Sequence, residues 1–320
     1  MMDIQSVQEQ GQKIINNVGK VIVGKEETAT LLLTALFAGG HVLLEDVPGS
    51  GKTKLAKSLA ASLDADFARV QFTPDLLPGD VTGMNVYNRK TEEFELHKGP
   101  AFTNILLADE INRATPRTQA GLLECMEEKQ VTIDGVSYGL SEPFFVIATQ
   151  NPIENAGTFP LPEAQLDRFM MKLSMGLPTK EEEKEILRRF GKEDPLETLI
   201  AVMSGEEFLQ MKKAISEVFV HEAIEEYLVS IAAATRNNSK IILGVSTRGT
   251  IALLHCVKAY AALSGRNYCI PDDVKKLAVP VLAHRLQISY GYQQGREAES
   301  MIEEILKEVP VPTEDFSLIR

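Results

Sequence analysis

The sequence predicts an α/β domain with a parallel sheet, followed by a helical domain. Over the first half of the 320 residues, apolar strand-like runs alternate with helical patterns, the order expected of a parallel sheet covered by helices. The run Ile105–Ala108 is apolar throughout, as expected of a strand buried on both faces, so we place it in the centre of the sheet. After Pro178 helical periodicity dominates to about Lys307. We therefore expect an α/β core with an N-terminal helix at 1–178 and an all-α domain at 179–320.

Each element follows from its local pattern. The strands of the first domain are short apolar runs with polar or glycine residues at their ends, and they are predicted at 42–45, 67–72, 105–109, 144–149 and 169–175. Thr179 and Glu182 form a capping box, which predicts a helix start directly after the domain boundary. Apolar residues spaced by three or four predict the helices of the second domain, at 180–190, 206–217, 222–234, 247–264, 272–283 and 297–308.

Two insertions interrupt the α/β pattern. Residues 78–87 and 94–96 predict a hairpin that projects from the core, and the runs 131–133 and 136–138 flank Asp134-Gly135, a strong hairpin-turn signal. Each hairpin could be a solvent-side ornament. The presence of two hairpins in one core favours a functional role for their surfaces.

Composition limits the partners and the cellular address. The net charge of −12 argues against non-specific attraction to nucleic acid or to anionic membranes. The three cysteines have no ligand-like spacing, so we expect buried reduced thiols and a cytoplasmic location. The polar N-terminus has no signal-like core, and the longest apolar stretch, 31–38, is too short for a bilayer, so no membrane segment is expected.

A phosphate-binding loop is the clearest chemical signal. An apolar strand runs into a glycine turn that ends Gly51-Lys52-Thr53, and a helical pattern follows. In such a P-loop the backbone N–H groups face the phosphates, Lys52 reaches the β- and γ-phosphates, and the Thr53 hydroxyl binds Mg²⁺. The strict pattern has glycine where this chain has Asp46, which leaves the entry turn open. The residues predicted to bind the nucleotide here are Pro48, Gly49, Ser50, Gly51, Lys52, Thr53 and Lys54.

Polar side chains follow two strands of the predicted sheet. Asp109 and Glu110 end the buried strand, at the carboxyl edge where open parallel sheets bind ligands. Asp109 is placed to hold Mg²⁺ through water, and Glu110 to polarise the water that attacks the γ-phosphate. Asn151, after a later strand, could orient that water, although Asn before Pro152 is also typical of a turn. A surface acidic pair that merely ends a strand is the alternative for Asp109 and Glu110.

Four segments together resemble the AAA+ ATPases of the MoxR family. They are His41-Val42-Leu43-Leu44-Glu45, Ala108-Asp109-Glu110-Ile111-Asn112-Arg113, Ala148-Thr149-Gln150-Asn151-Pro152 and Leu161-Pro162-Glu163-Ala164-Gln165-Leu166-Asp167-Arg168-Phe169. The resemblance implies a P-loop NTPase core of the AAA+ type, followed by a helical lid. It also implies that Lys52 and Thr53 belong to Walker A, Asp109 and Glu110 to Walker B, and Asn151 to sensor 1.

The same resemblance implies roles for two arginines and for an adenine-contacting segment. Arg168 is similar in position to the arginine finger offered to a neighbouring subunit's ATP, and Arg248 to sensor 2 of the lid; Val23-Gly24 resembles the adenine-contacting segment. A guanidinium supplied in trans neutralises transition-state charge. Ser246 is a plausible N-cap, so Arg248 would leave from a helix end. A plain salt bridge for Arg168 and a solvated helix arginine for Arg248 remain the alternatives.

The resemblance implies a Mg²⁺-dependent ATPase that forms a homo-oligomeric ring, expected as a hexamer. The family is associated with chaperone-like remodelling or maturation of client proteins, often with partners that carry a von Willebrand factor A domain. The alternative is the metal-insertion motor subunit of a magnesium-chelatase-like enzyme. A nucleic-acid motor is a third reading, against which the acidic charge and the absence of Trp count. A non-enzymatic ATP switch is disfavoured by the intact Asp109-Glu110 pair.

Overall fold

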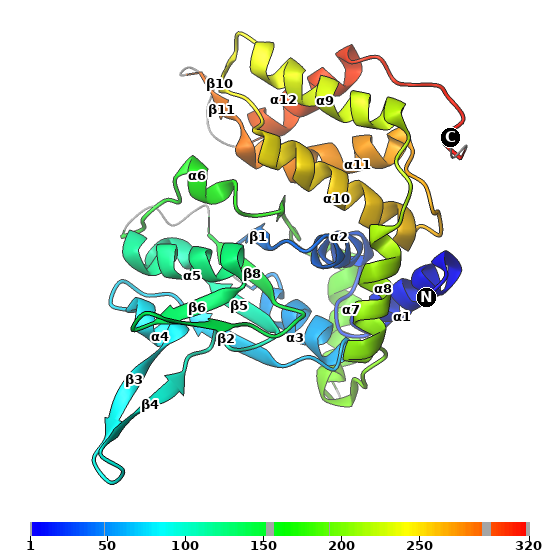
Figure 1. Cartoon of the computed structure of the whole chain (residues 1–320). Helices are drawn as coiled ribbons and strands as arrows, with labels where there is room; N and C mark the ends of the chain where they lie inside the picture. Colours follow the sequence, from blue (N-terminus) through cyan, green and yellow to red (C-terminus); the bar gives the residue numbers. More distant parts are fainter. Residues whose placement is uncertain (1, 48, 152–156, 192, 290–295, 318–320) are drawn as a thin grey trace.

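The computed structural model describes residues 2–47, 49–151, 157–191, 193–289 and 296–317. Figure 1 shows a sheet with helices on its two faces, and a group of helices that covers one side of this α/β part. Among the described residues, no helix combines the length and the apolar character that crossing a membrane requires. The three cysteines are buried and unpaired with one another, as the sequence predicted.

The central sheet has five parallel strands in the order β2-β5-β8-β1-β9. Their bounds are β1 Val42–Glu45, β2 Phe67–Gln71, β5 Ile105–Asp109, β8 Phe145–Gln150 and β9 Met171–Leu173. Strand β5 is an interior strand, flanked by β2 and β8, while β8 takes the middle position. Alternate residues of β5 belong to different apolar clusters, Ile105 and Leu107 to one and Leu106 and Ala108 to the other, so both of its faces are buried.

Strand β9 is shorter than the predicted 169–175, and hydrogen bonds explain where it ends. The N–H groups of Met175 and Gly176 donate to the carboxylate of Asp46, at 2.6 and 3.0 Å, and not to a neighbouring strand. At the other end, the carbonyl of Phe169 accepts hydrogen bonds from His284 and Arg285. Side chains therefore take the backbone groups that a longer strand would have paired.

Helices cover both faces of the sheet. One face contacts the N-terminal helices and the helix after the P-loop, which are α1 Ile4–Gly19, α2 Glu26–Phe37 and α3 Lys52–Ser62. The other face contacts α5 Pro116–Glu128, which follows the short 3₁₀ helix η1 Ile111–Arg113. The short helix α6 Glu163–Leu166 precedes β9 in the chain.

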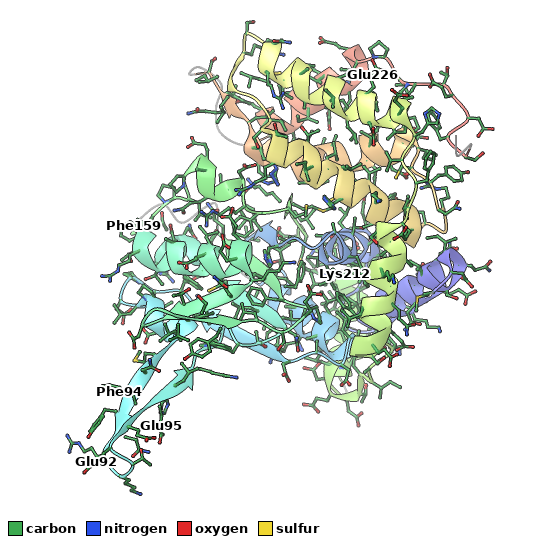
Figure 2. All side chains as sticks on the ribbon, in the orientation of Figure 1. Glu92, Phe94, Glu95, Phe159, Lys212 and Glu226 are labelled. Carbon is green, nitrogen blue, oxygen red and sulfur yellow. The ribbon has the colours of Figure 1, made fainter. Side chains whose placement is uncertain are left out.

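Both predicted hairpins are confirmed. The first is formed by β3 Gly83–Asn88 and β4 Glu93–Lys98 after the short helix α4 Pro78–Thr82, and the second by β6 Gln130–Ile133 and β7 Val136–Gly139. The β3–β4 hairpin projects well beyond the body of the molecule (Figure 1). Figure 2 shows Phe94 and Glu95 on this projecting hairpin, and Phe94 is 71% exposed. The outer part of the hairpin therefore faces solvent, since Tyr87 is exposed there as well.

The second half of the chain is helical, as predicted. Its helices are α7 Lys180–Phe190, α8 Gly205–Ser216, α9 Glu222–Asn237, α10 Thr247–Leu263, α11 Pro271–Leu282 and α12 Glu297–Glu308, with 3₁₀ turns η2 Pro195–Thr198 and η3 Ala283–Arg285. A short antiparallel pair, β10 Ile241–Leu243 with β11 Gln287–Ile288, adds to them and lacks a sequence signal of useful length. Helices α7 and α8 lie beside α1 and α3, and α9–α12 form the outer group (Figure 1).

Candidate nucleotide site

The turn between β1 and α3 has the backbone of a phosphate-binding loop. Gly49 and Gly51 both have left-handed φ angles, 85° and 91°, which residues with a Cβ rarely adopt. Gly51 directly precedes α3, so the first N–H groups of this helix face the loop. The Ser50 hydroxyl is buried and has no hydrogen-bond partner within the described chain, which suits a ligand oxygen. Pro48, also predicted to bind the nucleotide, lies outside the described residues.

The departure at Asp46 does not close this loop. The Asp46 carboxylate is turned toward the end of β9, where it accepts hydrogen bonds from the Ser174 hydroxyl at 2.7 Å and from the Met175 and Gly176 amides. Three donors offset the cost of burying this carboxylate, which is 5% exposed. Lys52 Nζ donates to the carbonyl oxygens of Asp46 at 2.9 Å and Val47 at 3.2 Å, so the lysine spans the loop that it would share with phosphates.

A cavity of about 590 Å³ opens beside the loop. Its polar lining contains most of the residues predicted to bind nucleotide or metal, together with Arg69, Gln71 and Thr149; the predicted ones are Gly49, Ser50, Gly51, Lys52, Thr53, Lys54, Asp109, Glu110 and Asn151. The apolar lining is formed by Val21, Ile22, Val23, Met175, Pro178, Ile186 and Phe190. A triphosphate with an aromatic base requires these two kinds of lining in one cavity.

Val23 and Lys25 line the cavity, and Gly24 lies between them in the chain. Gly24 has a φ of 69°, and a Cβ at this position would overlap the side chain of Glu182 on α7. A residue with a Cβ would therefore be strained by this φ and would displace the Glu182 side chain. Lys54 lines the cavity too, but its ammonium pairs with Asp194 at 2.5 Å and lies over the Phe190 ring, so it is engaged away from the loop.

The two acidic residues at the end of β5 are held by a hydrogen-bond network. Asp109 Oδ1 accepts from the Thr149 hydroxyl at 2.6 Å, and Asp109 Oδ2 accepts from Arg69 Nη2 at 2.6 Å. Glu110 Oε2 accepts from Gln71 at 2.7 Å and from Arg113 at 2.9 Å. The network fixes both carboxylates at the cavity wall.

The backbone of Glu110 is itself unusual, because its φ of 56° places a residue with a Cβ in the left-handed region. Its N–H donates to the Thr149 hydroxyl at 2.8 Å, which holds this turn. Non-glycine residues in this region are concentrated at functional sites. This conformation turns the backbone from the end of β5 into η1 at Glu110, the predicted catalytic glutamate.

Three residues of the cavity lining, Arg69, Gln71 and Thr149, were not predicted from the sequence. Arg69 lies in the middle of β2 and Gln71 at its end, and Gln71 is the register partner of Asp109 on the adjacent strand. Polar residues at the end of β2 were the available signal, but the neighbour relation of β2 and β5 is a tertiary fact. Asn151, by contrast, was predicted, and it lies 6% exposed at the end of β8 on the same cavity.

The donor set fits Mg²⁺. A hydroxyl from Thr53 and a carboxylate from Asp109 both line the cavity, and oxygen ligands of this kind are the ones Mg²⁺ prefers beside phosphates. Arg69 pairs with the same carboxylate, and 46% of its side chain is exposed, so it is free to turn toward solvent. The residues present are therefore compatible with the metal.

Arg168 and Arg248 do not line this cavity. They meet at Glu127 near the end of α5, where Arg168 Nη2 lies 3.2 Å from one carboxylate oxygen and Arg248 Nη2 contacts the other. Arg168 follows α6, and Arg248 lies in the first turn of α10, whose N-cap is Ser246 as predicted. Together with Asp167 and Arg285 they line a separate cavity of about 130 Å³. We refer to Glu127, Asp167, Arg168, Arg248 and Arg285 as the arginine cluster.

Arg285 fastens the segment that carries Arg168 to the lid. Its guanidinium is buried and donates to Asp167 Oδ1 at 2.7 Å and to the carbonyl oxygens of Asp167 and Phe169 at 3.1 and 2.6 Å. His284 Nε2 lies 3.1 Å from the Phe169 carbonyl, and burial, followed by the charge of Arg285, lowers the pKa of His284 to about 3. A neutral histidine and a paired arginine thus join η3 to residues 167–169.

The chain matches known families over most of its length. Residues 41–171 match the family described as ATPase family associated with various cellular activities, and residues 233–308 match the AAA lid domain. The chain is 39% identical to Chaperone MoxR1 of Mycobacterium tuberculosis, over 94% of this chain and 82% of the relative, and 31% identical to Protein MoxR of Paracoccus denitrificans, over 91% and 93%. It belongs to the MoxR family of AAA+ ATPases. The MoxR fold with its helical lid is thereby established for this chain, as the sequence predicted.

Two other matches agree with this assignment. The chain is 50% identical to the YeaC protein of Bacillus subtilis over 94% of this chain and 95% of the relative. A crystal structure of a Cytophaga hutchinsonii protein, named as a candidate ATPase, has a TM-score of 0.88 and 41% identity and covers 97% of each chain. Membership of this family makes the chain a nucleotide-binding protein of the ATPase class.

Proposed function

We propose that this MoxR-family protein hydrolyses ATP with Mg²⁺ and uses the reaction to remodel or mature a client protein. The observation that carries the proposal is the convergence of the glycine loop, the Asp109–Glu110 pair and Asn151 on one cavity. Phosphoryl transfer needs positioning and charge stabilisation more than covalent chemistry, and these groups supply both.

The residues of the cavity divide the work. Loop N–H groups and Lys52 bind the phosphates, and the apolar wall that includes Val23 receives the base. Thr53 and Asp109 would hold Mg²⁺, which neutralises phosphate charge when bound. Glu110 polarises the attacking water, and Asn151 orients it. Gln71 and Arg113 both bind the Glu110 carboxylate, so they set where that base can reach.

We propose that the active form is a homo-oligomeric ring, a hexamer, in which neighbours share each site. Arg168 and Arg248 lie together on Glu127 and outside the cavity of their own chain, which supports a role toward a neighbour's nucleotide. The family resemblance places Arg248 at sensor 2 of the lid. Its position beside Arg168 favours delivery of both guanidiniums from one face.

The client and the moving parts are further parts of the proposal. Because one relative is named a chaperone, we propose a protein client, including partners with a von Willebrand factor A domain, and a cytoplasmic location. The boundary at residue 178 divides the core from the lid, and α7 begins there with the predicted Thr179–Glu182 capping box. We propose that the exposed β3–β4 hairpin contacts the client and moves with the core.

Glu110→Gln tests the proposal. This variant removes the base but keeps side-chain shape, so it should bind ATP with unchanged affinity, lose turnover, and retain a client in a pull-down with ATP and Mg²⁺. Glu124→Gln, an exposed change on α5, is the matched control and should behave as wild type. Normal hydrolysis by Glu110→Gln would overturn the assignment of the base, and wild-type protein that consumes no ATP at any concentration would overturn the function.

A further inference from the structure

We propose that Glu127 is an internal stand-in for nucleotide phosphate, which holds Arg168 and Arg248 in the unassembled chain and is displaced when a neighbour's nucleotide arrives. The inference rests on the proposed ring ATPase and gives Glu127 a role that opposes its assembly. Its basis is the arrangement of the arginine cluster, in which one carboxylate contacts two guanidiniums from two different parts of the chain.

The geometry at Glu127 is that of an anion between two cations. Oε2 lies 3.2 Å from Arg168 Nη2, while Oε1 contacts Arg248 Nη2, so each carboxylate oxygen satisfies one guanidinium. A terminal phosphate offers the same oxygens with more negative charge and suits the planar donors of arginine. The chain therefore contains a weaker ligand of the same chemistry at the place where the two arginines meet.

Exposure separates the exchangeable part of the cluster from its fixed part. The side chains of Glu127 and Arg168 are each 32% exposed, and that of Arg248 is 49% exposed. The side chain of Arg285 is 3% exposed and binds the Asp167 carboxylate and three carbonyl oxygens, those of Asp167, Phe169 and Val281. Half-exposed ion pairs are weak and exchange readily, whereas a buried, multiply bonded arginine does not. The backbone beneath Arg168 stays fixed while its guanidinium is free to leave Glu127.

The pairing has a predictable effect on assembly. Both arginines must leave Glu127 before they reach a neighbouring nucleotide, so the carboxylate opposes formation of the shared site. Two weak ion pairs correspond to about a fivefold change in an equilibrium constant. Removal of the carboxylate should therefore favour assembly, and should leave the turnover of fully assembled protein unchanged or higher.

The test compares Glu127→Gln with wild type, and Glu128→Gln is the matched control. Glu128 is the next residue of α5 and is exposed, and its side chain has no ion pair within the described chain. ATP hydrolysis per chain is measured against protein concentration, and sedimentation velocity with a non-hydrolysable ATP analogue measures association. Glu127→Gln should reach half-maximal turnover and half-association at about fivefold lower concentration, and Glu128→Gln should match wild type.

The split between concentration dependence and maximal turnover distinguishes this role from a structural one. Unchanged half-maximal concentration in folded Glu127→Gln would overturn the inference, and so would a loss of turnover at saturating protein, which would mean that Glu127 orients the arginines for catalysis. Glu127→Ala removes both oxygens and provides the second test if the glutamine variant does not fold. If wild-type protein hydrolyses no ATP, the proposed function fails, and the sedimentation arm still tests Glu127.

Discussion

The nucleotide cavity and the arginine cluster differ in how their residues are brought together. The loop, the acidic pair and Asn151 sit at the carboxyl ends of adjacent parallel strands, so the sheet alone aligns them. The arginine cluster draws its side chains from α5, the segment after α6, α10 and η3, and the lid must be docked for them to meet. The proposed phosphate-binding groups are therefore placed by the core alone, whereas the positions of Arg168 and Arg248 depend on how core and lid are joined.

Arg168→Ala is expected to have the largest effect and tests whether the two regions act separately. If this arginine acts on a neighbour's ATP, turnover should fall by about a thousandfold, while nucleotide affinity of the isolated chain stays unchanged. Steady-state hydrolysis at high protein concentration and equilibrium binding of a fluorescent ATP analogue provide the two measurements. Parallel loss of binding and turnover would place Arg168 in the cavity of its own chain and contradict the separation of the two regions.

Arg285→Met sharpens the distinction within the arginine cluster. The change removes the arginine donors of the Asp167 carboxylate and of the Phe169 carbonyl, which then keeps its hydrogen bond from His284, so the free energy of unfolding should fall by about 3 kcal/mol. Urea denaturation measures the loss. Arg248→Met is the comparison, because its half-exposed ion pair should contribute less than about 1 kcal/mol. Equal losses for the two variants would remove the division into fixed and exchangeable contacts.

Acid should lower the free energy of unfolding through two buried histidines, one of them at the contact between the lid and residues 167–169. Burial lowers the pKa of His284 to about 3 and that of His41, which bridges Met126 and Val146, to about 4. Unfolded histidine binds protons below pH 6.5, so stability is complete above that value and is lost as the pH falls toward 4. At pH 5 each histidine should cost about 2 kcal/mol relative to pH 7.5. Urea midpoints that do not change between these pH values would contradict the buried neutral histidines.

The smallest of the four effects is expected at the loop. Lys52→Ala removes one charge-assisted contact to phosphate, worth about 2 kcal/mol, so ATP affinity should weaken about thirtyfold. Lys57→Ala, an exposed lysine on the same helix, is the control and should leave affinity unchanged. Isothermal titration of both variants gives the comparison. An affinity of Lys52→Ala equal to that of the control would show that the lysine remains on the carbonyl oxygens of Asp46 and Val47 when ATP binds.

Much of the fold was predictable from local patterns. The five strands and the helices of the second half follow from apolar periodicity, and both hairpins follow from their turns, because each pattern reports burial within one short segment. The end of β9 was not predictable, because the Asp46 carboxylate that takes its amides comes from 128 or more residues earlier in the chain. The doubt about Asp46 was likewise settled by the position of its side chain.

Local sequence patterns were enough to predict the α/β core, the helical lid, the glycine loop and the polar residues Asp109, Glu110 and Asn151, because motifs at strand ends are placed by the sheet. Only the tertiary structure decided that Arg69 and Gln71 hold the acidic pair, and that Arg168 and Arg248 share Glu127. Those contacts join side chains that are distant in the sequence, and no local periodicity encodes which of them meet. Their partners are set by how β2 lies beside β5 and how the lid docks on α5.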